Sequence, residues 1–127
     1  TEMDNIMFCA MTHNPQPLHL DEEFAKNTEY GQRIVNSMFT LGLLVGVTVG
    51  DTTLGTTLGN LGMTEVRFAN PVFHGDTLRA VTKVKGMRES KSRPTAGLVE
   101  LEHFAFNQSD KEVAYCVRTA LMQKRPT

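Results

Sequence analysis

The chain has 127 residues, with 13 basic and 14 acidic side chains and a net charge of −1. This length predicts one domain over residues 1–127, long enough to bury a core. The balanced charge excludes a whole-molecule positive field that would attract nucleic acid or an anionic membrane. The first residues show no basic segment followed by an apolar one, so nothing marks secretion and we expect a cytoplasmic protein.

A short helix is predicted at the start of the chain, over residues 2–12. Thr1 and Asp4 have the spacing of a capping box, and apolar residues then recur at helical intervals. The prolines of segment 13–17 end this helix, because proline removes a backbone donor and disfavours the α conformation in the residue before it. Asp21 is placed to cap a second short helix that begins with two glutamates. Because the chain starts on a cap, we expect a preceding segment in the native protein.

The most apolar stretch runs from Ile34 to Val49 and has no charged residue. Apolar residues occupy every side of its helical wheel, which is typical of a helix buried in a membrane or in the middle of a fold. The run is shorter than the ~20 residues that span a bilayer and includes polar side chains, which favours the second alternative. Glycines at 42, 46 and 50 predict a face that a sheet approaches closely. We expect a core helix wrapped by strands.

The pattern changes to that of strands in the second half of the chain. The predicted strands are 61–68, 77–84, 97–107 and 112–123. The last one is apolar on both faces and should lie centrally in the sheet. Residues 85–93, with four basic side chains, are predicted to form a mobile hairpin loop. A long helix followed by an antiparallel meander predicts an α+β fold with the helix packed on one face of the sheet.

The cysteines and histidines predict no metal site. Cys9 falls in a predicted helix and Cys116 in a predicted strand without CxxC spacing, so both are expected to be buried thiols. No two histidines share a helical face with a carboxylate as a zinc site needs, and we expect no metal or redox cofactor. His74, followed by Gly-Asp, is predicted to form a turn. His103 is predicted to have a structural role.

A long motif begins with Asn14-Pro15-Gln16-Pro17-Leu18-His19-Leu20-Asp21 and continues with Phe24-Ala25, Tyr30-Gly31 and Ile34-Val35-Asn36-Ser37-Met38. Later parts are Phe68-x-x-Pro71-Val72-x-x-Gly75-Asp76 and Arg88-Glu89. This pattern resembles the MaoC-like (R)-specific enoyl-CoA hydratase family. The family motif is Asp-x-Asn-Pro-x-His, followed by an aromatic-Gly pair and a buried helix that opens Ile-Val-His-Gly-Met. The resemblance implies a hot-dog fold, an antiparallel sheet curled around a long central helix, and at least a homodimer. The family's first strand has no counterpart in this sequence.

The resemblance also implies addition of water to a trans-2-enoyl-CoA thioester, or the reverse dehydration, with CoA as part of the substrate. In the ungapped match His19 is the acid/base, and Asn14 takes the place of the catalytic aspartate. The thioester oxygen would meet a backbone N–H at Ser37, since a helix start presents unpaired donors where enolate charge develops. The other expected substrate-binding residues are Asn36, Gln16 and Gly31. Arg88, Lys91 and Arg93 of the basic loop are expected to meet the CoA phosphates.

Asn14 departs from the family pattern because it cannot accept a proton. Shifting the register to match Asn14-Pro15 with the family's Asn-Pro places Thr12 at the aspartate position, which also supplies no carboxylate. His19 would then be the sole base, or a neighbour would replace the aspartate, or the thioester would bind without being hydrated. The candidate replacements are His13, Asp21 and Glu29.

Two other functions remain compatible with the pattern. A hot-dog thioesterase would need a carboxylate, from Glu29 or Asp21, aimed at the carbonyl. A non-catalytic thioester-binding subunit would explain the missing aspartate. For the hydratase, the polar side chains of the motif favour a short polar or branched acyl group of the mesaconyl-CoA or methylmalyl-CoA type.

Overall fold

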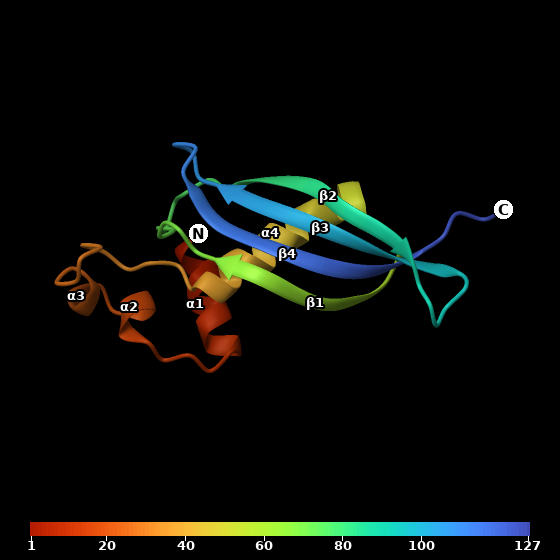
Figure 1. Ribbon diagram of the computed structural model, residues 1–127. Helices are drawn as coiled ribbons and strands as arrows, with labels where there is room; N and C mark the ends of the chain where they lie inside the picture. The colour runs from red at the N-terminus through yellow and green to blue at the C-terminus, as the bar shows by residue number, and fades with distance from the viewer.

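The computed structural model describes residues 1–127, with all helices preceding the strands along the chain (Figure 1). The helices are α1 (Glu2–Met11), α2 (Pro17–Leu20), α3 (Glu22–Ala25) and α4 (Ser37–Thr52). The strands are β1 (Thr57–Arg67), β2 (Arg79–Glu89), β3 (Ala96–Phe106) and β4 (Glu112–Gln123). They form one antiparallel sheet in the order β1-β4-β3-β2. Helix α4 runs along one face of this sheet, and α1 to α3 gather at one end of it (Figure 1). The predicted α+β layout is confirmed.

The N-terminal helices begin where their capping residues predict. Thr1 and Asp4 form the capping box of α1, and the Asp21 carboxylate accepts the N–H of Phe24 at the start of α3. Helix α2 was not predicted. It is a single turn that starts at Pro17, whose fixed φ suits the first position of a helix. This turn carries His19.

Helix α4 begins at Ser37 because Asn36 caps it with its side-chain oxygen, which accepts the N–H of Met38 at 2.9 Å. Its buried row is Thr40, Leu44 and Thr48. Leu44 packs with residues of β3 and β4 in the main core cluster.

The predicted contact between the glycine row and the sheet is wrong. Gly42, Gly46 and Gly50 are exposed, and a Cβ added at any of them would meet nothing within 4 Å. A residue two positions after the buried row points about 200° away from it. The glycines therefore lie on the side of α4 that faces away from the sheet, together with the exposed side chains of Leu43 and Val47.

Strand β4 lies between β1 and β3, as predicted, and both its faces are buried from Val113 to Arg118. The predicted loop over 85–93 is wrong for its first half. Strand β2 continues to Glu89, paired with β3, and only the segment between Ser90 and Thr95 forms the turn. Strand β2 is at the edge of the sheet, and charged side chains are common on edge strands. They do not prevent its backbone from pairing with β3 on the inner side.

The two cysteines are free and buried, as predicted. The turn predicted at His74 is also present. No helix has the length and apolar character needed to cross a membrane.

Candidate active site

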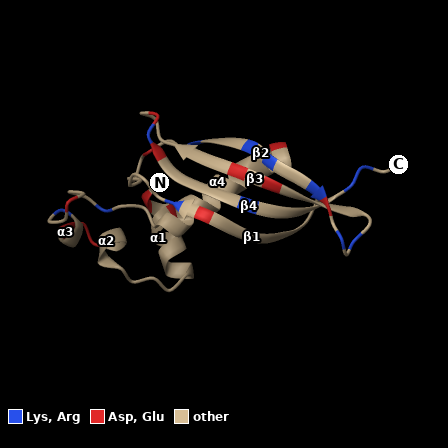
Figure 2. Ribbon diagram, in the orientation of Figure 1, with Lys and Arg blue, Asp and Glu red and all other residues tan.

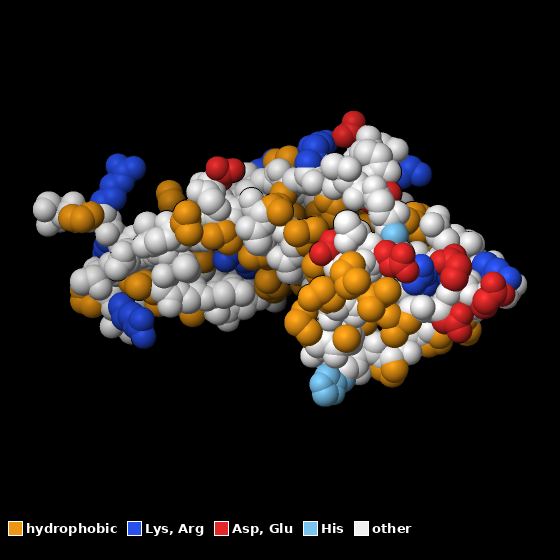
Figure 3. All heavy atoms as spheres, turned by 180° about the vertical axis from the view of Figure 1, so that it is seen from behind, with side chains coloured by type: hydrophobic (Ala, Val, Ile, Leu, Met, Phe, Trp, Pro, Cys, Tyr) orange, Lys and Arg blue, Asp and Glu red, His pale blue; other side chains and the backbone are white.

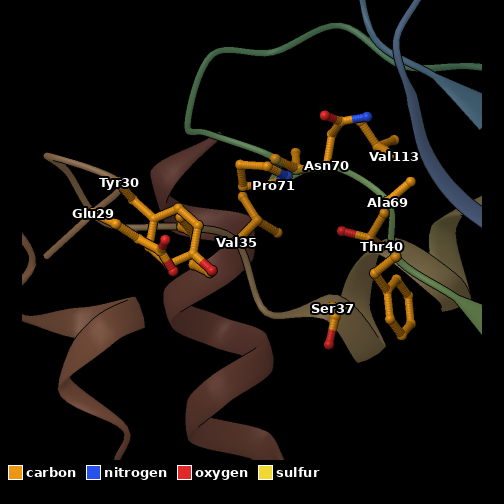
Figure 4. Close-up of a pocket in the computed structure, with 12 residues that line it drawn as sticks. Glu29, Tyr30, Val35, Ser37, Thr40, Ala69, Asn70, Pro71 and Val113 are labelled. Atoms are coloured by element: carbon orange, nitrogen blue, oxygen red, sulfur yellow. The ribbon is translucent and has the colours of Figure 1, made fainter.

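A pocket of about 280 Å³ opens at the N-terminal end of α4 (Figure 4). Its walls come from four segments: the loop before α4, the first turn of α4, the connection from β1 to β2, and the start of β4. The polar side chains among its lining are those of Glu29, Tyr30, Ser37, Thr40 and Asn70. The remaining lining is mainly apolar and includes Val35, Pro71, Val72 and Val113.

The first turn of α4 supplies free hydrogen-bond donors at this pocket. The N–H of Met38 is taken by the Asn36 cap, and the N–H of Thr40 donates to the Asn36 carbonyl. The N–H groups of Ser37 and Phe39 have no acceptor within the chain. Unpaired donors at a helix start favour bound negative charge. Ser37 is the predicted site residue that lines the pocket.

His19 adjoins the pocket without lining it. Its ring Nδ1 lies 2.9 Å from the carbonyl oxygen of Ile34, a residue of the pocket wall. A carbonyl oxygen only accepts, so Nδ1 carries a proton, and in the neutral ring Nε2 has the lone pair. Nε2 has no partner within the chain and is not buried. The contact with Ile34 thus selects, for the neutral ring, the tautomer in which Nε2 can accept a proton.

Asn14 is placed elsewhere. Its side-chain oxygen accepts the N–H of Gln16 at 3.0 Å, which is a local Asx turn. It lines a separate open depression together with Cys9 and His13. Gln16 is exposed and precedes α2 without capping it by its side chain. The structure therefore does not bring Asn14 or Gln16 into the pocket at α4.

Asn36 and Gly31, the other predicted substrate-binding residues, do not line the pocket. Asn36 is 4% exposed, and its side chain caps α4 and donates to the sulfur of Cys9 at 3.8 Å. Gly31 is exposed and has a φ of +70°, a left-handed conformation that suits glycine in the turn before the pocket.

Of the candidates to replace the missing aspartate, only Glu29 lines the pocket. Its side chain lies beside that of Tyr30, away from Ser37 (Figure 4). The carboxylate of Asp21 caps α3, and His13 is exposed next to Asn14 in the open depression.

The three predicted phosphate-binding cations lie together, but at the other end of the sheet. Arg88, Lys91 and Arg93 surround a second hollow of about 420 Å³ that also contacts Leu121 of β4. Val113 of the first pocket is on the same strand, and the eight-residue separation corresponds to about 26 Å. The ribbon in Figure 2 is blue, for lysine and arginine, at the hairpin end of the sheet, far from α1 to α3.

Asn5 and His74 lie near the site but were not predicted to belong to it. Asn5 of α1 is fully buried and contacts His19, Asn36 and the turn residue His74. The available signal was that Asn5 shares the inner side of the predicted first helix with Cys9, four residues later. A polar residue on that side requires buried partners.

The sheet with one long helix along its face defines the hot-dog class. A Mycobacterium tuberculosis protein described as a double hot-dog fold aligns with 93% of this chain and 36% of its own, with a TM-score of 0.82 and 22% identity. An Archaeoglobus protein described as a monoamine oxidase regulatory protein aligns with 99% of this chain and 84% of its own, with a TM-score of 0.90 and 31% identity.

Within that class, the MaoC-like domain matches residues 1–105, and the chain belongs to this family. The chain is 36% identical over 124 residues to mesaconyl-CoA hydratase of Cereibacter sphaeroides, covering 98% of this chain and 36% of that protein. It is 30% identical over 125 residues to β-methylmalyl-CoA dehydratase of Chloroflexus aurantiacus, covering 98% and 35%. The chain thus spans about a third of the length of these two relatives.

Proposed function

We propose that the protein is an acyl-CoA hydratase or dehydratase, which adds water to a trans-2-enoyl-CoA double bond or removes it. The observation that carries this proposal is the arrangement of His19 and α4. One ring nitrogen of His19 is anchored on the pocket wall and the other is free as a base. The first turn of α4 has an unpaired N–H at Ser37 on the same pocket.

In the proposed hydration, the Ser37 N–H binds the thioester oxygen. Nε2 of His19 takes a proton from water while the water oxygen forms a bond to C3 of the acyl group. The double-bond electrons move toward the thioester oxygen, where the helix N-terminus stabilises the enolate. The imidazolium then returns its proton to C2, which completes the addition of one water. Histidine suits both roles because it titrates near neutral pH.

This mechanism needs no carboxylate at position 14, since His19 both accepts and returns the proton. Asn14 is then free to stabilise the turn in which it is found. Its contribution to the site is to hold the chain ahead of α2, rather than to contact the water.

For the acyl group, we propose a short, branched or polar chain. The relatives named above are a mesaconyl-CoA hydratase and a β-methylmalyl-CoA dehydratase. The pocket of about 280 Å³ is small, and Thr40 and Asn70 add polar groups to its wall. Equal or better turnover of unbranched medium-chain enoyl-CoA esters would contradict this choice.

We also propose that the protein acts as a homodimer or higher homo-oligomer. Val47 on the outer side of α4 is 55% exposed, Leu43 is 36% exposed, and the neighbouring glycines add no side chains. Apolar side chains are seen along this side in Figure 3. A contiguous exposed apolar surface marks an interaction site, and glycine lets another backbone approach closely.

The test is the loss of absorbance of the enoyl-thioester band with a panel of unsaturated CoA esters. We expect turnover of at least one ester by the wild type and a rate lower by a factor of ~10² or more in His19→Ala. His13→Ala is the matched control, because His13 is exposed and lies outside the pocket at α4. Binding of CoA esters without turnover by the wild type would instead identify a thioester-binding subunit.

A thioesterase is the second candidate, because the Glu29 carboxylate lines the pocket. In that reaction water attacks the thioester carbonyl and free CoA is released. Thiol detection with saturated acyl-CoA, for the wild type and Glu29→Gln, separates the two reactions. CoA release that depends on Glu29 and not on a double bond would favour the thioesterase.

A further inference from the structure

Asn5 of α1 is fully buried, and every polar group of its side chain has a partner. Its Oδ1 accepts the backbone N–H of Asn36 at 2.9 Å and the thiol of Cys9 at 3.8 Å. Its Nδ2 donates to the carbonyl oxygen of His19 at 3.2 Å and to Nε2 of His74 at 2.9 Å. One side chain therefore joins α1 to the turn with the proposed base, to the start of α4, and to the turn before β2.

The chemistry of the partners fixes the orientation of this amide. The backbone N–H of Asn36 can only donate and the carbonyl of His19 can only accept, so Oδ1 and Nδ2 cannot be exchanged. His74 must then accept at Nε2 and carry its proton on Nδ1. A rotated amide would bring two donors together at Asn36 and two acceptors at His19.

These bonds continue into a network that connects His19 with the segment before α4. The His19 side chain donates to the carbonyl of Ile34, and the Ile34 N–H donates to the carbonyl of Leu18 at 3.2 Å. Asn5 links the backbone of His19 to that of Asn36, the residue before Ser37. His19 is thus linked to the segment before Ser37 at two points: its side chain contacts Ile34, and its backbone is joined through Asn5 to Asn36.

We propose that Asn5 is a positioning residue that sets the place of His19 relative to the Ser37 N–H. It lies outside the pocket lining and acts only through its partners. For its effect on turnover the inference rests on the proposed hydratase function, whereas its effect on the His19 ring does not. A fully satisfied buried polar group of this kind restricts the arrangement of the segments around it.

His74 supports the same arrangement because it accepts only while neutral. Burial lowers its pKa, and the charges of Arg33 and of the N-terminus lower it further, while those of Glu2 and Glu22 raise it. Neutral His74 leaves the second N–H of Asn5 satisfied.

The test compares Asn5→Asp and Asn5→Ala with the wild type. Asn5→Asp keeps the size and the acceptor for Asn36 but has no N–H for His19. An aspartate paired with protonated His74 would still lack this donor. We expect kcat to fall by about 10- to 100-fold with KM for the CoA ester nearly unchanged, as for a small displacement of a catalytic group. Asn5→Ala introduces no buried charge and serves as the second variant if Asn5→Asp does not fold.

Histidine nitrogen NMR provides a readout that does not depend on turnover. The wild type should show His19 as a single tautomer protonated at Nδ1, and both variants should show a mixture. Leu101→Ala, a cavity variant in β3 with a side chain 3% exposed, is the matched control for lost stability. It should keep the single tautomer and the wild-type kcat.

Wild-type kcat and an unchanged His19 tautomer in the Asn5 variants would overturn the inference. The inference would also be overturned if kcat and the His19 tautomer changed no more in the Asn5 variants than in Leu101→Ala at the same loss of thermal stability. A wild type that hydrates no enoyl-CoA would contradict the proposed function alone, and the NMR comparison would still decide the role of Asn5.

Discussion

His103 is the centre of a buried hydrogen-bond chain that crosses three strands on the α4 side of the sheet. Nε of Arg118 donates to Nε2 of His103 at 2.8 Å, so the proton of His103 is on Nδ1, 2.7 Å from the hydroxyl of Thr82. His103 is therefore neutral in the folded protein. Burial, followed by the charge of Arg118, lowers its pKa from 6.5 to about 4.

This shift makes the protein sensitive to acid. Between pH 6.5 and about 4 the unfolded chain binds a proton at His103 and the folded chain does not. Stability is therefore complete above pH 6.5 and falls as the pH decreases, by about 3 kcal/mol over the whole window. Urea unfolding between pH 7 and pH 4.5 measures this slope. His103→Gln should reduce it, with the remainder due in part to His74, whose pKa is also lowered. His13→Gln is the exposed control, and an equal slope in both variants would contradict the assignment.

Capping decides where the helices begin, and this was predictable from single residues. Thr1, Asp4 and Asp21 cap α1 and α3 as their sequence positions predict. The extension of β2 to Glu89 was not predictable, because it depends on pairing with β3 at positions that the local sequence does not identify. The same holds for the site. The motif predicted a site at His19 and Ser37, and the structure places Ser37 in the pocket lining and His19 against Ile34 of the pocket wall. The contacts of Asn5 and the separation of Asn14 from the pocket depend on tertiary packing, which the motif does not contain.

The contribution of the Asn36 cap of α4 to stability can be measured. Asn36→Ala removes the oxygen that accepts the Met38 N–H, and we expect the free energy of unfolding to fall by about 1–2 kcal/mol. Asn36→Ser keeps an oxygen at the capping position and should cost less, about 0.5 kcal/mol. Thermal or urea unfolding of the two variants gives the comparison. Equal losses would mean that the contact with Cys9, rather than the cap, accounts for the effect.

At the scale of the whole molecule, α4 is apolar all round while the sheet of this chain covers only one side of it. The sequence predicted a helix buried on every side, and the difference is the outer row of Leu43 and Val47 with the adjacent glycines. An apolar surface of this kind is stable in water when another layer covers it. The proposed homo-oligomer supplies that layer.

Val47→Glu tests this arrangement. A carboxylate buried without a partner between two copies of α4 costs several kcal/mol, so we expect the dimer dissociation constant to rise by ~100-fold or more. Sedimentation velocity across a concentration series measures the change. The matched control is Met11→Glu, since Met11 is 70% exposed and belongs to a second row of exposed apolar side chains, formed with Met3 and Met7 on α1. A dimer that survives Val47→Glu and dissociates in Met11→Glu would move the interface from α4 to α1. A wild type that is monomeric at all concentrations would contradict the homodimer itself.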